Sequence, residues 1–227
     1  PRLMNFERIA PFYQLIESLT AGSSAQQCRT ALLHHLAFAK SVLLLGEGNG
    51  RYLCVLRERF PEMEITVVDS SAKMLQLLRE RLATKSFTED KITLIEQDIL
   101  HWEVPVDRYD AVVANFFFNC FGPTELKTLI HKIAPAIKPK GICLLAEFRE
   151  PRQWFRRLRA KIILKLMYGF FRYSTQLDAR RLSSPDEPLE DAGFHLRERE
   201  LHEWGLLHAD LWVRRGEGRG AQGEGKT

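Results

Sequence analysis

The chain has 227 residues, 45% of them hydrophobic and 27% charged, with a formal net charge of +4. This size and composition predict one sizeable soluble α/β domain with additions rather than two ordinary domains. No apolar run reaches the ~18 residues of a membrane span, no signal-peptide pattern opens the chain, and the four cysteines form no C-x-x-C pair, so we expect a cytoplasmic protein without a zinc site or disulfide framework.

The first 40 residues are expected to form a helical cap before the first strand. An apolar stripe between Ala31 and Phe38 follows a Gly22-Ser23-Ser24 break, which predicts a helix after that break. His34 and His35 are adjacent in this stretch. On a helix they would point about 100° apart, so they could not bind one metal from a single helical face.

Residues 41–70 contain a strand, a glycine turn, a helix and a second strand. The run Val42 to Leu45 is wholly apolar, as in a central parallel strand covered on both faces. Glycines then permit a sharp reversal and the close approach of a ligand. The second strand ends at Asp69, whose carboxylate can accept hydrogen bonds from two ribose hydroxyls. The segment therefore predicts a nucleoside site.

The spacing of the glycines separates two kinds of nucleoside site. A dinucleotide site has the pattern G-x-G-x-x-G, whereas Gly46, Gly48 and Gly50 give G-x-G-x-G, with Arg51 where the third glycine would stand. Glu47 lies inside the turn, where a carboxylate would repel a diphosphate and attract a sulfonium or an ammonium. A cationic ligand is therefore favoured.

This arrangement resembles motif I of the class I S-adenosylmethionine-dependent methyltransferases. The resemblance implies that the residues from Gly46 to Gly50, including Glu47, bind the methionine end of S-adenosylmethionine, and that Asp69 and Ser70 lie at its ribose. The alternative interpretation is an ordinary βαβ turn with a surface aspartate.

A third strand, Ile92 to Ile95, precedes Gln97-Asp98-Ile99. In the methyltransferases that this chain resembles, an acidic residue here accepts from the adenine amino group, and its neighbour supplies a backbone amide. The resemblance thus places Asp98 and Ile99 at the adenine. A helix-capping or loop aspartate is the other interpretation of Asp98.

The fourth expected strand, Tyr109 to Ala114, leads into Asn115-Phe116-Phe117-Phe118-Asn119. Ligands of doubly wound sheets collect at the carboxyl ends of the strands, so this segment should line the reaction pocket. It lacks the [DN]-P-P-[FYW] turn of enzymes that methylate exocyclic amines, and the chain lacks the carboxylate cluster of the magnesium-dependent catechol type. Its phenylalanines favour an apolar organic acceptor, although they could equally be buried beneath the pocket.

The remaining site predictions concern the donor, the acceptor and a general base. Asn115 is predicted to contact the donor. The predicted acceptor pocket consists of Tyr13, Phe116, Phe117, Asn119 and Arg149. The candidates for a general base, if one is used, are Tyr13, His34, His35 and Glu147. We predict no metal site.

Residues 151–182 combine apolar residues near i, i+4 spacing with many arginines and lysines, which predicts a basic amphipathic helix. We favour a substrate lid; a contact with an anionic membrane and a merely solvated helix are the alternatives. Nucleic acid is disfavoured because no RNA-binding motif accompanies the charge. Residues 216–227 are predicted to be a disordered tail.

Two final strands, Phe194 to His202 and Leu206 to Arg214, resemble the antiparallel addition of methyltransferases. The predicted fold is α/β: a Rossmann-like, doubly wound, mostly parallel seven-stranded sheet with a C-terminal antiparallel hairpin and helices on both faces, over residues 41–215. The resemblance, closest to the ubiquinone and menaquinone biosynthesis group, implies methyl transfer from S-adenosylmethionine to a small acceptor. The alternatives are a catalytically silent S-adenosylmethionine-binding scaffold and an NAD-dependent reductase. The sequence does not indicate an oligomeric state.

Overall fold

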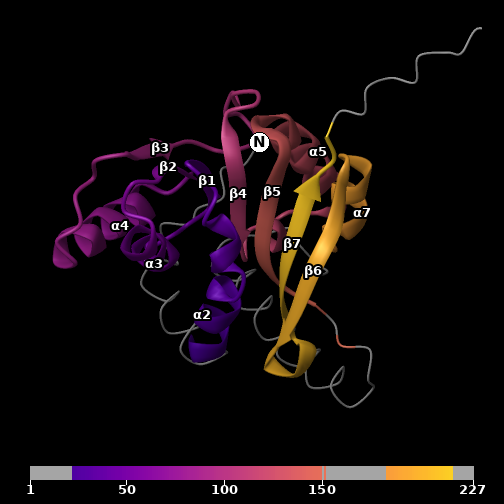
Figure 1. Ribbon diagram of the computed structural model, residues 1–227, viewed down its shortest axis with the longest axis horizontal. Helices are drawn as coiled ribbons and strands as arrows, with labels where there is room; N and C mark the ends of the chain where they lie inside the picture. The colour runs from indigo at the N-terminus through magenta and orange to yellow at the C-terminus, as the bar shows by residue number, and fades with distance from the viewer. Residues whose placement is uncertain (1–21, 150, 152–182, 217–227) are drawn as a thin grey trace, which may run out of the picture.

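The computed structural model describes residues 22–149, 151 and 183–216, and its centre is one seven-stranded sheet (Figure 1). The strand order is β3-β2-β1-β4-β5-β7-β6. The strands are β1 Ser41–Leu45, β2 Glu64–Asp69, β3 Ile92–Glu96, β4 Tyr109–Asn115, β5 Ile137–Phe148, β6 Phe194–His202 and β7 Leu207–Arg214. Strands β1 to β5 pair in parallel, whereas β7 is antiparallel to both β5 and β6. The predicted sheet and hairpin are confirmed.

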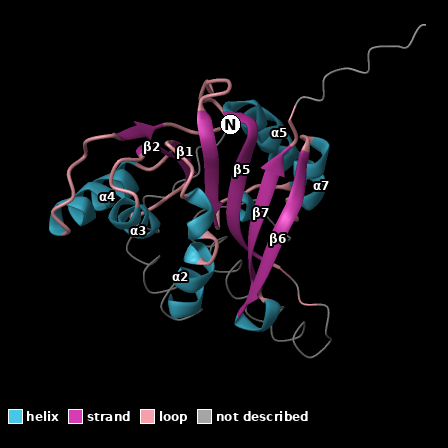
Figure 2. Ribbon diagram, in the orientation of Figure 1, coloured by secondary structure: helices cyan, strands magenta, loops and turns pink. Residues whose placement is uncertain are grey.

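Helices cover both faces of this sheet (Figure 2). The helices are α2 Gly22–Thr30, α3 Arg51–Arg59, α4 Ala72–Thr84, α5 Pro123–Ile133 and α7 Asp186–Asp191. Short 3₁₀ turns are η2 Leu33–Leu36, η3 Phe118–Cys120, η4 Ala134–Ala136 and η5 Glu203–Gly205. One buried apolar cluster joins α2, α3 and α4 to the sheet, and a second joins α5 and α7 to the other face. Strand β1 is buried along its whole length because both clusters meet there.

The prediction for residues 22–38 is wrong in its details. The Gly-Ser-Ser segment begins α2 instead of breaking a helix, and the Ser24 hydroxyl donates to Glu203 Oε2 in η5 at 2.8 Å. Glycine and serine are common residues at helix starts, so the same letters fit both interpretations. The apolar stretch from Ala31 to Phe38 contains only the 3₁₀ turn η2. Its leucines pack on the sheet while Phe38 is 56% exposed, so the stripe reflects burial and not a helical face.

Several predicted features lie outside the described residues. They are Tyr13, the tail after Gly216, the first part of the 1–40 cap and, apart from Pro151, the basic segment 151–182. The described part of the cap shares the core of the sheet, because Cys28 and Leu36 are both buried in the α2–α4 cluster. Among the described residues, no helix has the length and apolar character that crossing a membrane requires.

Candidate functional site

The parallel strands bring the predicted donor residues to one edge of the sheet. Leu45 of β1 pairs with Val68 of β2 and with Ala114 of β4. Gly46, Asp69 and Asn115 each come one residue after these positions, so they lie side by side at the carboxyl edge. The adjacent β3 adds Asp98, because Gln97 N donates to Asp69 O at 3.1 Å.

The turn after β1 depends on glycine for two reasons. Gly46, Gly48 and Gly50 have φ values of 59°, 67° and 79°, in the region that other residues rarely adopt. A Cβ on Gly46 would also overlap the ring of Phe117, whereas one on Gly48 would meet nothing within 4 Å. Gly46 is therefore required by packing as well as by backbone conformation.

Two carboxylates stabilise this turn from within. Glu47 Oε1 accepts from Tyr52 N and Leu53 N, both at 2.9 Å, so Glu47 caps the start of α3. Burial raises the pKa of Glu47 to about 7. Asp69 accepts from Gly48 N at 3.1 Å and from Ser71 N at 2.9 Å, and it thereby links the turn to the end of β2. Burial raises the pKa of Asp69, while these two N–H donors oppose that shift.

The residues predicted at the adenine differ in how far they are available to a ligand. Asp98 Oδ1 accepts from Leu100 N at 2.9 Å, and Asp98 Oδ2 lies 3.2 Å from His101 Nδ1. Ile99 is only 4% exposed and packs in the core beside Val68. Its side chain therefore offers little surface to a base, and a contribution from Ile99 would come mainly from its backbone.

Two polar atoms at this edge are buried without a hydrogen-bond partner in the described structure: Asn115 Nδ2, at the end of β4, and Tyr52 Oη, at the start of α3. Leaving such a group unpaired costs roughly 1–3 kcal/mol. Asn115, which ends β4 at the carboxyl edge, is only half-buried, whereas Tyr52 belongs to the buried core.

Arg29, on α2, is a residue near the β1–α3 turn that the sequence analysis missed. Its guanidinium carbon lies 5.0 Å from the centroid of the Phe116 ring, immediately after β4. Its charge also lowers the pKa of Glu47, so the two groups are electrostatically coupled. The chain thus brings a cation and a carboxylate together at the β1–α3 turn. No sequence pattern indicated this, because the path of α2 across the sheet depends on tertiary packing.

The residues predicted on the acceptor side differ in their surroundings. Phe117 lies against the glycine turn, and the Phe116 and Phe148 ring centroids are 5.1 Å apart. Asn119 does not line an open pocket, because it is 9% exposed and its Nδ2 donates to Glu147 Oε2. Glu147, a candidate general base, is 0% exposed beneath η3 and faces no open crevice. Arg149 follows β5, and its backbone N donates to Leu206 O at 2.8 Å.

Comparisons with known proteins agree with this geometry. A family model described as "Methyltransferase domain" matches residues 42–141. Malonyl-[acyl-carrier protein] O-methyltransferase of Priestia megaterium is 36% identical over 109 residues, covering 48% of this chain and 36% of that protein. Demethylmenaquinone methyltransferase of Deinococcus radiodurans is 30% identical over 148 residues, covering 64% of this chain and 59% of that protein.

The chain is therefore similar to methyltransferases, and the family model matches residues 42–141, less than half of its length. Its fold is also that of the magnesium protoporphyrin IX methyltransferase of Synechocystis, solved with bound S-adenosylhomocysteine. That structure has a TM-score of 0.69 and 16% identity, and the match covers 93% of this chain and 97% of that one. The chain spans only 36% and 59% of these two curated relatives, so its activity and substrates are proposals.

The histidines predicted as general bases lie away from the carboxyl edge of the sheet. His35 Nε2 is 2.9 Å from Glu198 Oε2 on β6. Glu198 pairs with Leu211 of β7, and Leu211 pairs with Leu144 of β5, three residues before Glu147. The His34 and His35 ring centroids are 4.1 Å apart, so the predicted divergence of the two side chains is not observed. The geometry gives neither histidine a place near the donor turn.

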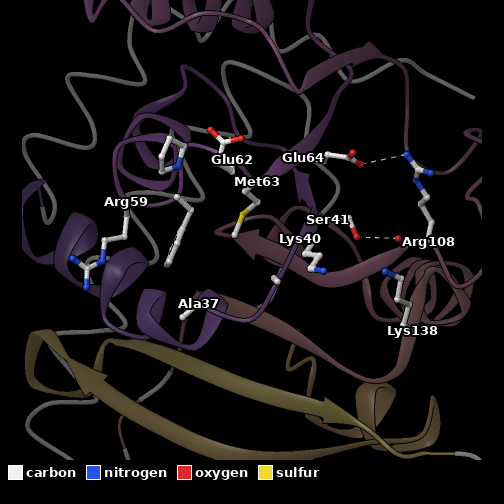
Figure 3. Close-up of a pocket in the computed structure, with 12 residues that line it drawn as sticks. Ala37, Lys40, Ser41, Arg59, Glu62, Met63, Glu64, Arg108 and Lys138 are labelled. Atoms are coloured by element: carbon white, nitrogen blue, oxygen red, sulfur yellow. Dashed lines mark hydrogen bonds and ion pairs between the residues drawn. The ribbon is translucent and has the colours of Figure 1, made fainter.

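A hollow of about 650 Å³ lies at the opposite edge of the sheet, where β1 and β2 begin (Figure 3). Lys40, Arg59, Arg108 and Lys138 line it, and Arg108 pairs with Glu64 at 3.8 Å. The predicted donor residues are at the other ends of these strands. The hollow is therefore separate from the donor site.

Proposed function

We propose that this chain transfers a methyl group from S-adenosylmethionine to a small organic acceptor. The observation that carries the proposal is the position of Asp69, which ends β2 and accepts from Gly48 N in the three-glycine turn. This arrangement supports a nucleoside site in which a ribose would meet a carboxylate already fixed by backbone donors. The relatives named above are methyltransferases, which supports the same donor.

The residues of the chain divide into those that would hold each part of the donor. Asp69 would accept from the ribose hydroxyls, and Asp98 from the adenine amino group. Glu47 and Arg29 would face the ammonium and the carboxylate of the methionine end, respectively. The unpaired Nδ2 of Asn115 would find a polar partner there.

The chemistry needs little more than positioning. When bound, the donor would supply a methyl group on a sulfonium, and the neutral thioether that departs is a good leaving group. The chain would orient the acceptor in line with that group and exclude water, and these effects can supply much of the acceleration. An acceptor that is already nucleophilic would need no strong general base.

An apolar or aromatic acceptor is the substrate class that the chain supports best. Phe116, Phe117 and Phe148 come from the ends of β4 and β5, beside the donor turn. Aromatic side chains favour flat, apolar ligands. The relative named demethylmenaquinone methyltransferase provides a precedent for such an acceptor. The scaffold alternative and the membrane contact rested on the basic segment 151–182, and no described residue supports either.

Calorimetric titration with S-adenosylhomocysteine tests the proposal. We expect the unaltered chain to bind and Asp69→Ala to bind at least about tenfold more weakly, since two charge-assisted hydrogen bonds to the ribose are lost. Asp191→Ala is the matched control, because Asp191 is an exposed aspartate on α7 that pairs only with surface Lys127 in the described structure. Equal affinity for Asp69→Ala and Asp191→Ala would refute the ribose assignment.

A further inference from the structure

Glu147 uses both carboxyl oxygens to hold the turn that follows β4. Its Oε1 accepts from Phe118 N at 2.8 Å, and its Oε2 accepts from Asn119 Nδ2. Phe118 and Asn119 are the first two residues of η3. One buried side chain of β5 therefore fixes η3 against the sheet.

The turn that Glu147 holds also carries an aromatic ring into the donor turn. Phe117 directly precedes η3, and its ring fills the space where Gly46 would carry a Cβ. On the side of η3, the Phe117 ring packs edge-on against Phe121 with 5.2 Å between centroids. A continuous line of contacts thus runs from β5 through η3 to the glycine turn.

Burial disfavours the negative charge of Glu147, whereas the N–H groups of residues 117–119 that it accepts from favour that charge. The titratable groups around it are His208 and Asp210 on β7, Arg199 on β6, Cys120 in η3 and Cys28 on α2. Arg199, the permanent cation among them, is bound to Asp210 and Asp186. Burial raises the pKa of Glu147 to about 8, and Asp210 adds to this effect. Burial therefore makes ionisation of this carboxyl group more costly than in water, while both of its oxygens accept hydrogen bonds.

We propose that Glu147 is a positioning residue of the donor site: its buried carboxyl group fixes η3 and thereby holds the Phe117 ring against the glycine turn. This inference rests on the proposed function, because the turn matters only if the donor binds there. It replaces the earlier interpretation of Glu147 as a general base, since a residue that is 0% exposed beneath η3 does not meet an acceptor. Ionisation of Glu147 would leave a buried negative charge beside Asp210. A movement of η3 that admits water would lower the cost of this charge.

The amide of Phe118 reports on this contact without any donor. We expect its NMR resonance in the full chain to titrate near pH 8 and to lose protection from hydrogen exchange above that pH. In Glu147→Gln the neutral amide still accepts from Phe118 N, so this titration should be absent. A Phe118 resonance that titrates identically in the two proteins would overturn the assignment of Glu147.

The affinity for S-adenosylhomocysteine tests the link to the donor site. We expect Glu147→Gln to bind within about twofold of the unaltered chain at pH 7, and Glu147→Ala and Asn119→Ala to bind about tenfold more weakly. Between pH 7 and 9 the affinity of the unaltered chain should fall more steeply than that of Glu147→Gln. Leu129→Ala, which removes buried side-chain volume from α5, controls for general destabilisation.

The outcomes separate the two proposals. If Glu147→Ala and Leu129→Ala both bind S-adenosylhomocysteine about as tightly as the unaltered chain, the positioning role is wrong. The proposed function would still stand. An unaltered chain that binds no S-adenosylhomocysteine would reject the proposed function, and the Phe118 amide would then decide the structural part alone. If Glu147→Ala fails to fold, Glu147→Gln and Asn119→Ala still provide both measurements.

Discussion

The two sides of the carboxyl edge are built in different ways. On the donor side, Glu47 and Asp69 accept from backbone N–H groups within six residues of themselves or across one βαβ unit. Around the turn after β4, Glu147 bonds to residues 28 and 29 positions away, and Arg29 packs on the Phe116 ring. The glycine-turn side of this edge is thus encoded locally, whereas the side around η3 depends on the completed sheet.

Gly46→Ala should produce the largest effect, because it disturbs both sides at their point of contact. A positive φ and overlap with the Phe117 ring together should lower the free energy of unfolding by about 3 kcal/mol and abolish donor binding. Gly48→Ala is the matched control, since it has a similar φ of 67° but no neighbour within 4 Å. Urea denaturation of both variants would test this, and equal losses would show that the Phe117 contact is unimportant. Phe117→Ala should partly rescue Gly46→Ala in a double-mutant cycle.

The buried carboxyl group beneath η3 should make stability depend on pH. Between its ordinary pKa of 4.5 and its raised value of about 8, Glu147 keeps a proton in the folded chain that the unfolded chain has released. The free energy of unfolding should therefore decrease as pH rises through this window, by about 2 kcal/mol or more. Denaturation at pH 5.5 and pH 8.5 would measure the change, and Glu147→Gln should show a smaller one. The same dependence in both proteins would contradict the assignment.

Arg29→Ala should separate the two ends of the donor. Its guanidinium is proposed to face the methionine carboxylate, so S-adenosylhomocysteine should bind about tenfold more weakly. Methylthioadenosine, which lacks the amino-acid group, should bind the variant and the unaltered chain equally. Arg51→Ala, at the start of α3, provides a comparison with another arginine near the turn. Parallel losses for the two ligands would contradict the role of Arg29.

The sequence predicts those parts of the site that are local in the chain, but not those that depend on tertiary packing. The Val42–Leu45 run, the three glycines and Asp69 are adjacent or one βαβ unit apart, so periodicity and turn chemistry suffice to place them. The contact of Arg29 with Phe116 and the contact of Glu147 with Asn119 form only through tertiary packing. The order of residues does not reveal which faces of α2 and β5 make these contacts. The Gly22–Ser24 segment shows the same limit, because glycine and serine suit both a linker and a helix start.

Asp98→Ala should have the smallest effect, because Asp98 is held only by its own loop and lies at the sheet's outer strand. We expect S-adenosylhomocysteine and methylthioadenosine to lose affinity by about threefold each, since both carry the adenine. Calorimetry with both ligands would measure the two changes. A loss confined to S-adenosylhomocysteine would place Asp98 at the methionine end instead and would blur the division proposed here.

A crystal structure with S-adenosylhomocysteine would test the central claim most directly. We predict that the ligand lies at the carboxyl edge with both ribose hydroxyls within about 3 Å of the Asp69 carboxylate and its amino-acid group between Glu47 and Arg29. Electron density for the ligand at the amino edge, in the hollow lined by Lys40 and Arg108, or a ribose without contact to Asp69, would contradict the account.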